Sequence, residues 1–208
     1  GTFGFRPGKY MAANDELRFT LCGRGGHAAL RRQTQDTVRA AARLILRLTR
    51  LNGAERIVSV GRVEAEGATN VIPDRVRLEG TMRCFDERVR RTLKERIGRL
   101  CDELARSEEM EIVPDIRAGY PCVVNDRRLT LQAAALAERL GYGTEALALR
   151  PTSEDFGWYA TRYPSLFYRL GVGPGAGRTH TASFSPREGA IHIGIDFMKR
   201  LALNFLKQ

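Results

Sequence analysis

Apolar and more polar side chains alternate over residues 17–22, where Leu17, Phe19 and Leu21 share one face. Alternation with a period of two is typical of a β-strand that buries one side. β-branched residues are enriched over residues 55–65, which also favours a strand. Four segments are predicted as strands: residues 17–22, 55–65, 74–84 and 111–118.

Two longer segments repeat apolar residues every three or four positions, which predicts amphipathic helices. The first helix is expected over residues 36–51 and should end at Asn52-Gly53. Its predicted buried stripe consists of Val38, Ala41, Ile45 and Leu48. The second helix is expected over residues 87–108, with a stripe of Val89, Leu93, Ile97, Leu100 and Leu104.

The order β-α-β-β-α-β is the pattern of a ferredoxin-like unit, in which two helices cover one face of a four-stranded antiparallel sheet. After Tyr120-Pro121 strands and helices alternate again, with helices expected over residues 126–140 and 188–206. This later part has too few strands for a complete α/β domain. We therefore predict an α/β protein with a ferredoxin-like α+β unit, whose remaining domain is only partly contained in the chain.

Composition is that of a globular protein, with 43% hydrophobic and 28% charged residues. No apolar run approaches the ~18–20 residues that a membrane helix needs, so no membrane association is predicted. The opening GTFGFRPGKY does not resemble a signal peptide and is expected to be a cut inside a longer protein. The four cysteines form no C-x-x-C pair, which favours reduced thiols and a cytoplasmic protein.

A formal net charge of +10 raises the hypothesis of nucleic-acid binding. The positive charge is scattered, however, and Arg39, Arg43 and Arg47 are expected to form a solvated helix face. No aromatic RNA-binding motif accompanies them. Nucleic acid is therefore not predicted as a partner, and salt-sensitive retention on nucleic acid would be the sign of this alternative.

The chain has three histidines. His27 follows the glycines of GRGGHAA, where a loop could present an imidazole to a substrate or could carry a histidine without a role. His180, in RTHTASF, is a potential zinc ligand, but one imidazole does not make a tetrahedral site. His192 lies between two isoleucines and is expected to be a partly buried structural residue.

Three other polar residues have both a structural and a functional interpretation. Glu154, in TSEDF, could stabilise a helix N-terminus or line a pocket. Asn70, in ATNVIPD, could be a turn residue, and Arg83 could be a solvated residue on the polar face of its strand.

Six motifs in order, GRGGHAA, ATNVIPD, LEGTMR, YPCVVND, TSEDFGWY and THTASFSPRE, resemble the co-catalytic zinc amidohydrolases, which include aminoacylase, hippurate hydrolase and the plant auxin-conjugate hydrolases. The resemblance covers almost the whole chain. It implies hydrolysis of N-acyl amino acids or related small amides by two zinc ions, with manganese or cobalt as possible replacements.

The same resemblance implies roles for five residues. His180 would be a metal ligand, and His27 would stabilise the oxyanion in the partner subunit of a homodimer. Asn70 would bind substrate near that oxyanion, Arg83 would contact a substrate carboxylate, and Glu154 would line the pocket. The other metal ligands and the general-base glutamate are expected outside this chain. Where the family usually has proline shortly after the lid histidine, this sequence has Leu30-Arg31-Arg32, so a less rigid loop is expected.

The resemblance implies that the chain has three segments: the end of an N-terminal catalytic segment (residues 1–15), a lid or dimerisation domain (16–119) and the C-terminal part of the catalytic domain (120–208). The dimer is expected to form through an edge strand and the first lid helix. The alternative function is a homodimerisation or binding module without chemistry of its own.

Overall fold

The computed structural model describes residues 1–206 and has a mixed α/β fold. The chain forms two compact units. The central unit comprises residues 11–122 and 151–157, and the terminal unit comprises residues 1–10, 123–150 and those from 158 onward.

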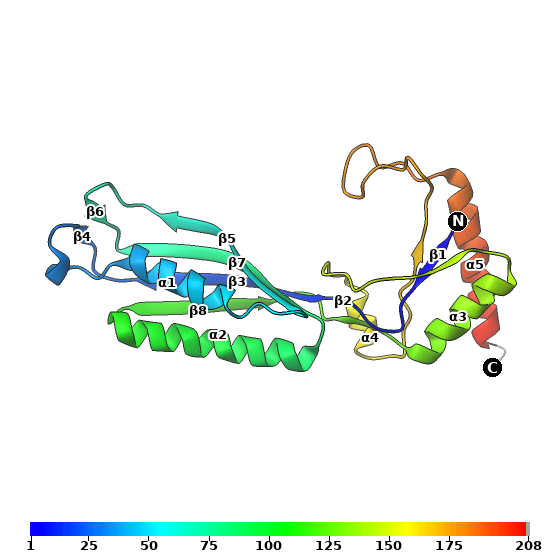
Figure 1. Cartoon of the computed structure of the whole chain (residues 1–208), viewed down its shortest axis with the longest axis horizontal. Helices are drawn as coiled ribbons and strands as arrows, with labels where there is room; N and C mark the ends of the chain where they lie inside the picture. The colour runs from blue at the N-terminus through cyan, green and yellow to red at the C-terminus, as the bar shows by residue number, and fades with distance from the viewer. Residues whose placement is uncertain (207–208) are drawn as a thin grey trace. The chain divides into compact units, whose positions relative to one another are not determined.

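The central unit is built on a four-stranded sheet in the order β5-β7-β3-β8, with every neighbouring pair antiparallel (Figure 1). Its strands are β3 (Ala13–Cys22), β5 (Arg56–Ala65), β7 (Arg75–Cys84) and β8 (Glu111–Ala118). Helix α1 (Thr37–Thr49) follows β3, and helix α2 (Glu87–Glu108) follows β7. The elements therefore occur in the order β-α-β-β-α-β.

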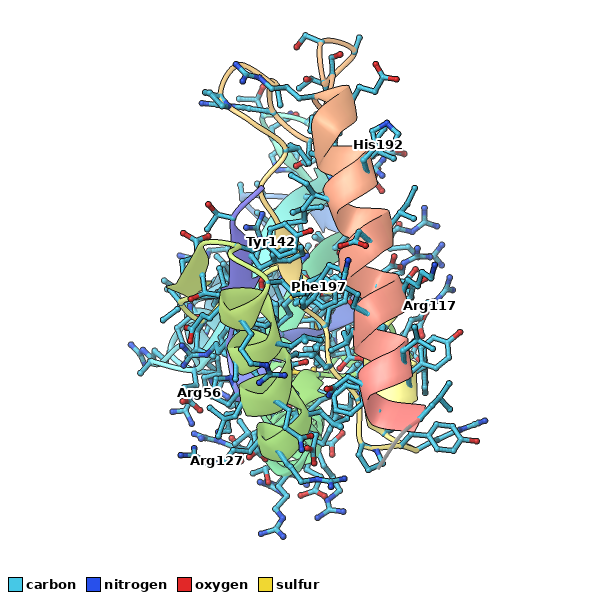
Figure 2. All side chains as sticks on the ribbon, turned by 90° about the vertical axis from the view of Figure 1, so that its right-hand side faces the viewer. Arg56, Arg117, Arg127, Tyr142, His192 and Phe197 are labelled. Carbon is cyan, nitrogen blue, oxygen red and sulfur yellow. The ribbon has the colours of Figure 1, made fainter. Side chains whose placement is uncertain are left out.

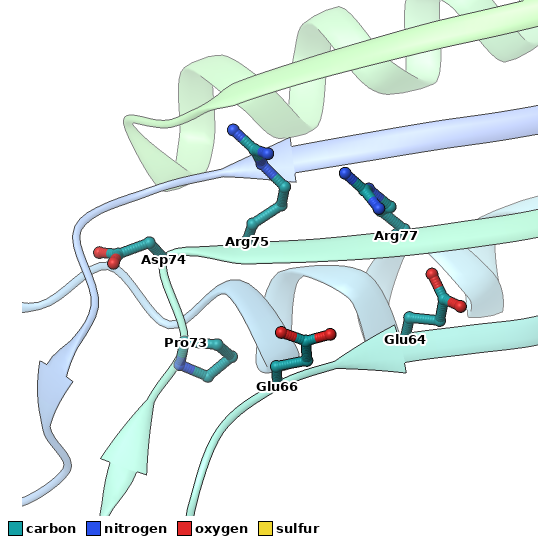
Figure 3. A pocket seen from close by; sticks show the side chains of 6 residues that line it. All are labelled: Glu64, Glu66, Pro73, Asp74, Arg75 and Arg77. Atoms are coloured by element: carbon teal, nitrogen blue, oxygen red, sulfur yellow. The ribbon is translucent and has the colours of Figure 1, made fainter.

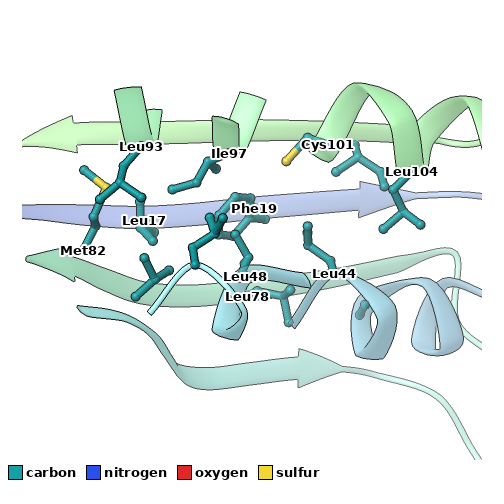
Figure 4. Close-up of a cluster of buried hydrophobic side chains, with 14 of the residues drawn as sticks. Leu17, Phe19, Leu44, Leu48, Leu78, Met82, Leu93, Ile97, Cys101 and Leu104 are labelled. Atoms are coloured by element: carbon teal, nitrogen blue, oxygen red, sulfur yellow. The ribbon is translucent and has the colours of Figure 1, made fainter. Parts of the chain in front are cut away.

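One hydrophobic core holds this sheet and both helices together (Figure 4). The strands contribute every second residue, so that Leu17, Phe19 and Leu78 are at most 1% exposed. From the helices come Leu44, Leu48, Leu93, Ile97, Cys101 and Leu104, all completely buried. The predicted stripe of α2 agrees with this core, since Val89 and Leu100 are its partly buried neighbours.

The predicted stripe of α1 agrees with the structure at Ala41 and Leu48, which are buried, and at Ile45, which packs against the core. Val38 and the predicted end of the helix were wrong. Val38 is 46% exposed, and Ala40 and Leu44 are buried instead. The helix ends at Thr49, with Arg50 as its C-cap. The Asn52 side chain bonds both backbone groups of Val58 on β5. Asn52 therefore joins the helix exit to the sheet and does not act as a helix cap.

Arginines along α1 form ion pairs with α2 and are not merely solvated. Arg39 donates to Glu108 at 2.5 Å, and Arg43 donates to the other oxygen of the same carboxylate. The Glu108 side chain is only 2% exposed. One buried carboxylate thus binds two guanidinium groups and connects the two helices.

A second buried ion pair lies where β3 begins. Asp15, completely buried, accepts hydrogen bonds from Arg90 at 2.6 and 2.9 Å and lies 3.2 Å from the Lys94 ammonium. Burial by itself would raise the pKa of Asp15, but the hydrogen bonds and charges of Arg90 and Lys94 outweigh it and hold that pKa below its usual range.

The terminal unit has a three-stranded sheet in the order β10-β1-β11. Strand β1 (Phe3–Phe5) pairs in parallel with β10 (Thr144–Ala146) and antiparallel with β11 (Arg169–Leu170). The remaining elements are the paired strands β2 (Gly8–Met11) and β9 (Val123–Asn125) and the helices α3 (Arg127–Arg139), α4 (Gly157–Ala160) and α5 (Glu188–Leu206).

The core of this unit is formed by aromatic rings from β1, from the loop between α3 and β10, and from α5. Phe197 of α5 lies 4.2 Å from Phe3 and 6.3 Å from Tyr142 between ring centroids (Figure 2). His192, by contrast, is exposed and points away from this core, so its predicted partial burial was wrong. His192 precedes Phe197 by five positions, which places it about 140° around the helix from the inward face.

Within residues 1–206, no helix is both long and apolar enough to cross a bilayer. The four cysteines are unpaired, and Cys84, Cys101 and Cys122 are buried.

Candidate functional site

His27 lies on a small ribbon at the far end of β3. The ribbon pairs β4 (Gly26–His27) with β6 (Val71–Ile72) in antiparallel register, with His27 opposite Val71. A Cβ atom on Gly25 would lie 2.4 Å from the Ile72 carbonyl oxygen, so only glycine allows the two backbones to approach this closely. The glycines before the histidine therefore serve the close pairing of the ribbon.

The His27 imidazole is exposed, and its two ring nitrogens differ. Nδ1 accepts a hydrogen bond from the Ala29 backbone amide at 3.2 Å. In the neutral ring the proton then resides on Nε2, because one ring nitrogen accepts while the other donates. His27 therefore presents an N–H donor at the tip of the ribbon.

Asn70 lies beside His27, as the pairing of the ribbon requires. The Ala28 amide donates to the Asn70 carbonyl at 2.9 Å, and the Asn70 side chain is exposed. Two of the predicted site residues are thus brought together from segments separated by more than forty positions. Both are polar donors at one exposed edge of the central unit.

A network that sequence reasoning missed fixes the base of the ribbon. Asp74 Oδ1 accepts from the Gly25 amide at 2.8 Å, and the Thr37 hydroxyl donates to the Pro73 carbonyl at 2.6 Å. Gln35 Oε1 accepts from the Arg24 amide at 2.8 Å. Asp74 belongs to the motif ATNVIPD, so its position directly after the proline was the available signal.

The neighbouring cavity, of about 280 Å³, is lined by Pro73 and by charged residues on and directly beside β5 and β7. Figure 3 shows the Asp74 carboxylate turned away from Glu64 and Glu66, which agrees with its bond to Gly25. The wall combines carboxylates with Arg75 and Arg77. Because the wall carries both negative and positive side chains, it does not indicate which class of ligand the cavity would bind.

Arg83 and Glu154 lie at the other end of the central unit. Arg83 Nη1 donates to the Ser153 hydroxyl at 2.9 Å and to the Pro151 carbonyl at 3.1 Å. Glu154 follows directly and is half-buried. The guanidinium therefore holds the segment that carries Glu154, a contact that residue type alone did not reveal.

His180 lies in the terminal unit, in a closed loop after the glycine-rich segment. Its φ of +66° is unusual for a residue other than glycine and is a conformation found at functional sites. Thr181 closes the loop by donating to the Arg178 carbonyl at 2.8 Å. The His180 imidazole is exposed.

Residues 1–206 contain no group of three or more His, Cys, Asp or Glu side chains that could hold a metal ion. His180 is thus one potential ligand without companions in this part of the protein. The described residues alone do not fit a two-metal centre, and no catalytic step through a metal can be built from them.

The chain matches the family model of Peptidase family M20/M25/M40 over residues 2–204. It is 30% identical over 213 aligned positions to an N-acetyldiaminopimelate deacetylase of Lactobacillus helveticus, covering 98% of this chain and 55% of that protein. It is also 30% identical to an N-acetylcysteine deacetylase of Bacillus subtilis, covering 100% and 56% respectively. The chain therefore spans about half the length of the curated relatives it matches.

Solved structures show the same architecture. A dinuclear metal binding peptidase of the M20 family from Bacillus subtilis has 28% identity and a TM-score of 0.83, over 99% of this chain and 53% of that one. A protein of methicillin-resistant Staphylococcus aureus has 25% identity and a TM-score of 0.90, over 99% and 56%. With the family match over nearly its whole length, the chain belongs to Peptidase family M20/M25/M40.

Proposed function

We propose that the whole protein to which this chain belongs is an amidohydrolase that cleaves the amide bond of N-acyl amino acids or related small amides. The observation that carries this proposal is the exposed His27 N–H donor beside Asn70, on a ribbon fixed at its base by Asp74. The family and the names of the deacetylase relatives support it.

Each predicted site residue has a role in this proposal. In the proposed homodimer, His27 donates its Nε2–H to the oxygen that becomes negatively charged when the amide carbonyl of a substrate in the partner subunit is attacked, and Asn70 binds substrate close to that oxygen. Arg83 contacts a substrate carboxylate and keeps the Glu154 segment at the edge of the pocket. The bonds from Arg83 to Ser153 and Pro151 support its positioning role.

His180 is proposed as one ligand of a pair of divalent metal ions, zinc in the first place and manganese or cobalt as alternatives. The remaining ligands would come from the part of the relatives' length that this chain does not span. The strained, exposed backbone position of His180 supports this role.

We further propose that residues 16–119 form a ferredoxin-like lid domain and that the lid mediates a homodimer. The strand order β5-β7-β3-β8 and the two helices in one core support the first statement. Residues 1–15 and 120–208 would belong to the catalytic domain. A cytoplasmic location is proposed because the four thiols are unpaired.

The test uses the full-length protein, analysed for bound metal and assayed on a panel of N-acyl amino acids. His180→Ala is expected to lose metal and activity together. His27→Ala should retain metal while kcat falls by ~10²–10³-fold, as expected for loss of one oxyanion donor. Normal turnover by His27→Ala would remove the proposed role of His27, and absence of any hydrolysis by the wild type would favour the binding-module alternative.

A further inference from the structure

A second cavity, of about 320 Å³, lies at the base of the ribbon, between the ribbon and the start of α1. Four arginines line it: Arg24, Arg31, Arg32 and Arg39. Arg31 and Arg32 form a short 3-10 turn after His27 (Arg31–Gln33). None of the proposed catalytic roles uses this cavity.

The cavity lies on the side of the ribbon opposite to His27. Ile72 is part of its wall and pairs directly with Gly26, whereas His27 pairs with Val71. Directly paired residues share a face, and successive residues alternate between faces. The Ile72 side chain therefore points away from the His27 face, so the arginine cavity is a separate site.

The acidic residues of the wall are largely engaged already. Glu108 accepts hydrogen bonds from Arg39 and Arg43, and Asp36 caps α1 by accepting from the Arg39 amide at 2.9 Å. Glu109 is the remaining acid of the wall.

Three guanidinium groups of the wall are not paired with a carboxylate within salt-bridge distance. Arg24, Arg31 and Arg32 form no salt bridge with any residue in the described range 1–206. The cavity therefore carries an excess of positive charge that its own acids do not balance.

Arg24 is also held in place before any ligand arrives. Its Nε donates to the Gln33 carbonyl at 2.7 Å, which leaves its two terminal nitrogens as donors. A fixed guanidinium loses less conformational entropy on binding than a free one, and its planar fork matches carboxylate and phosphate oxygens.

We propose that this cavity binds a small polyanion, carrying phosphate or carboxylate groups, through Arg24, Arg31 and Arg32. Binding would draw the Arg31–Gln33 turn towards Arg24 and so order the segment that directly follows His27. The proposal concerns the back of the ribbon and does not depend on the hydrolytic activity.

The experiment is a calorimetric titration of the 208-residue chain with pyrophosphate and, separately, with citrate, at fixed KCl concentration. The test variant is Arg31→Gln with Arg32→Gln. The matched control is Arg91→Gln with Arg96→Gln, which removes the same charge from exposed positions on α2. Circular dichroism checks that both variants keep the helical content of the wild type.

Saturable binding by wild type and control, weakened at least ~10-fold in the test variant, is the expected result, since each charged hydrogen bond contributes about one order of magnitude. Tighter binding of pyrophosphate or of citrate would identify the phosphate or the carboxylate source. In a parallel NMR titration, the Arg24 Nε–H resonance should shift. Equal weakening in both variants, or no saturable binding of either anion by the wild type, would overturn the proposal.

Discussion

Asp74 accepts a hydrogen bond from the Gly25 amide at 2.8 Å, which joins the strand that follows Asn70 to the loop that precedes His27. The backbone reinforces this link, because the Gly23 amide donates to the Asp74 carbonyl at 2.9 Å. One residue thus joins the two strands at the base of the ribbon that carries the proposed donors. The position of His27 therefore depends on a residue that does not touch the proposed substrate.

Replacing Asp74 should loosen the ribbon without unfolding the central unit. In Asp74→Ala the Gly25 amide loses its acceptor, at a cost of about 1 kcal/mol. Hydrogen exchange at the Gly25 amide, followed by NMR, should accelerate about fivefold. Asp74→Asn keeps an acceptor oxygen and should behave like the wild type. Equal acceleration in both variants would mean that charge, and not the hydrogen bond, holds the loop.

Sequence patterns predicted the central unit well because β3, β7 and α2 each bury one regular face. The bounds predicted for α2, residues 87–108, agree with the structure. The stripe of α1 was predicted correctly at Ala41, Ile45 and Leu48 but not at Val38, which is exposed while the small Ala40 is buried. The spacing of apolar residues indicates which side of a helix is buried, but it does not indicate how large a side chain fits there.

The site was less accessible to sequence reasoning, since its contacts join distant segments. The motifs identified His27 and Asn70 separately, and only the pairing of β4 with β6 places them side by side. The bond from Arg83 to Ser153 spans seventy positions and leaves no periodic signal. Local patterns carry no information on such partners.

The buried Asp15 should make stability depend on pH in a defined window. Its folded pKa lies below the unfolded value of about 3.9, so the unfolded state takes up the proton first as pH falls. The contribution of the ion pair is therefore fully present above that value and is lost as pH falls through the folded pKa.

Asp15→Asn should lower the free energy of unfolding at pH 7 by about 3 kcal/mol, because Arg90 stays buried and keeps only the more exposed Glu87 as an ion-pair partner. Urea unfolding at pH 7 and at successive values below 4 measures this effect, and the variant should lose less additional stability in acid than the wild type. Asp115→Asn, at an exposed ion pair, is the control and should change stability by less than about 1 kcal/mol. A variant as stable as this control at pH 7 would contradict the prediction.

Gly98 offers a stabilising substitution. It lies inside α2, and a Cβ atom there would meet nothing within 4 Å. Gly98→Ala should raise the free energy of unfolding by about 0.5–1 kcal/mol, because alanine loses less backbone entropy in a helix. Gly80→Ala is the opposite case, since its Cβ would lie 2.1 Å from the Ser59 carbonyl oxygen on β5. Thermal unfolding should move the two variants in opposite directions, and a destabilised Gly98→Ala chain would argue against the open space around α2.

Cys101 should resist alkylation in the folded chain. Burial, with a smaller contribution from Asp102, raises the pKa of its thiol to about 12. At pH 8 the reactive thiolate is then about one part in ten thousand. Iodoacetamide should modify the half-buried Cys22 first and Cys101 only in urea, as peptide mass spectrometry can follow. Modification of both at similar rates would indicate that α2 opens readily from the sheet.

The two edges of the central sheet differ in a way that favours β5 as the interface of the proposed homodimer. Strand β8 contains Pro114, which lacks a backbone donor and so weakens pairing at that edge. Strand β5 has no proline and exposes Ile57 and Val63, at 39% and 55%. Helix α1 also exposes Leu46, at 60%. Open backbone groups next to exposed apolar side chains favour addition of a second copy.

Val63→Lys combined with Leu46→Lys should therefore convert the proposed dimer into a monomer. Light scattering after gel filtration at micromolar concentration would give twice the chain mass for the wild type and the single mass for this variant. Val113→Lys places the same charge at a 47% exposed position on β8 and should leave the dimer intact, because the proline already makes that edge unsuitable. If Val113→Lys were the variant that dissociates, the interface would have to be assigned to β8. A wild-type chain that is monomeric throughout this range would remove the lid-mediated dimer altogether, and with it the donation of His27 to a partner subunit.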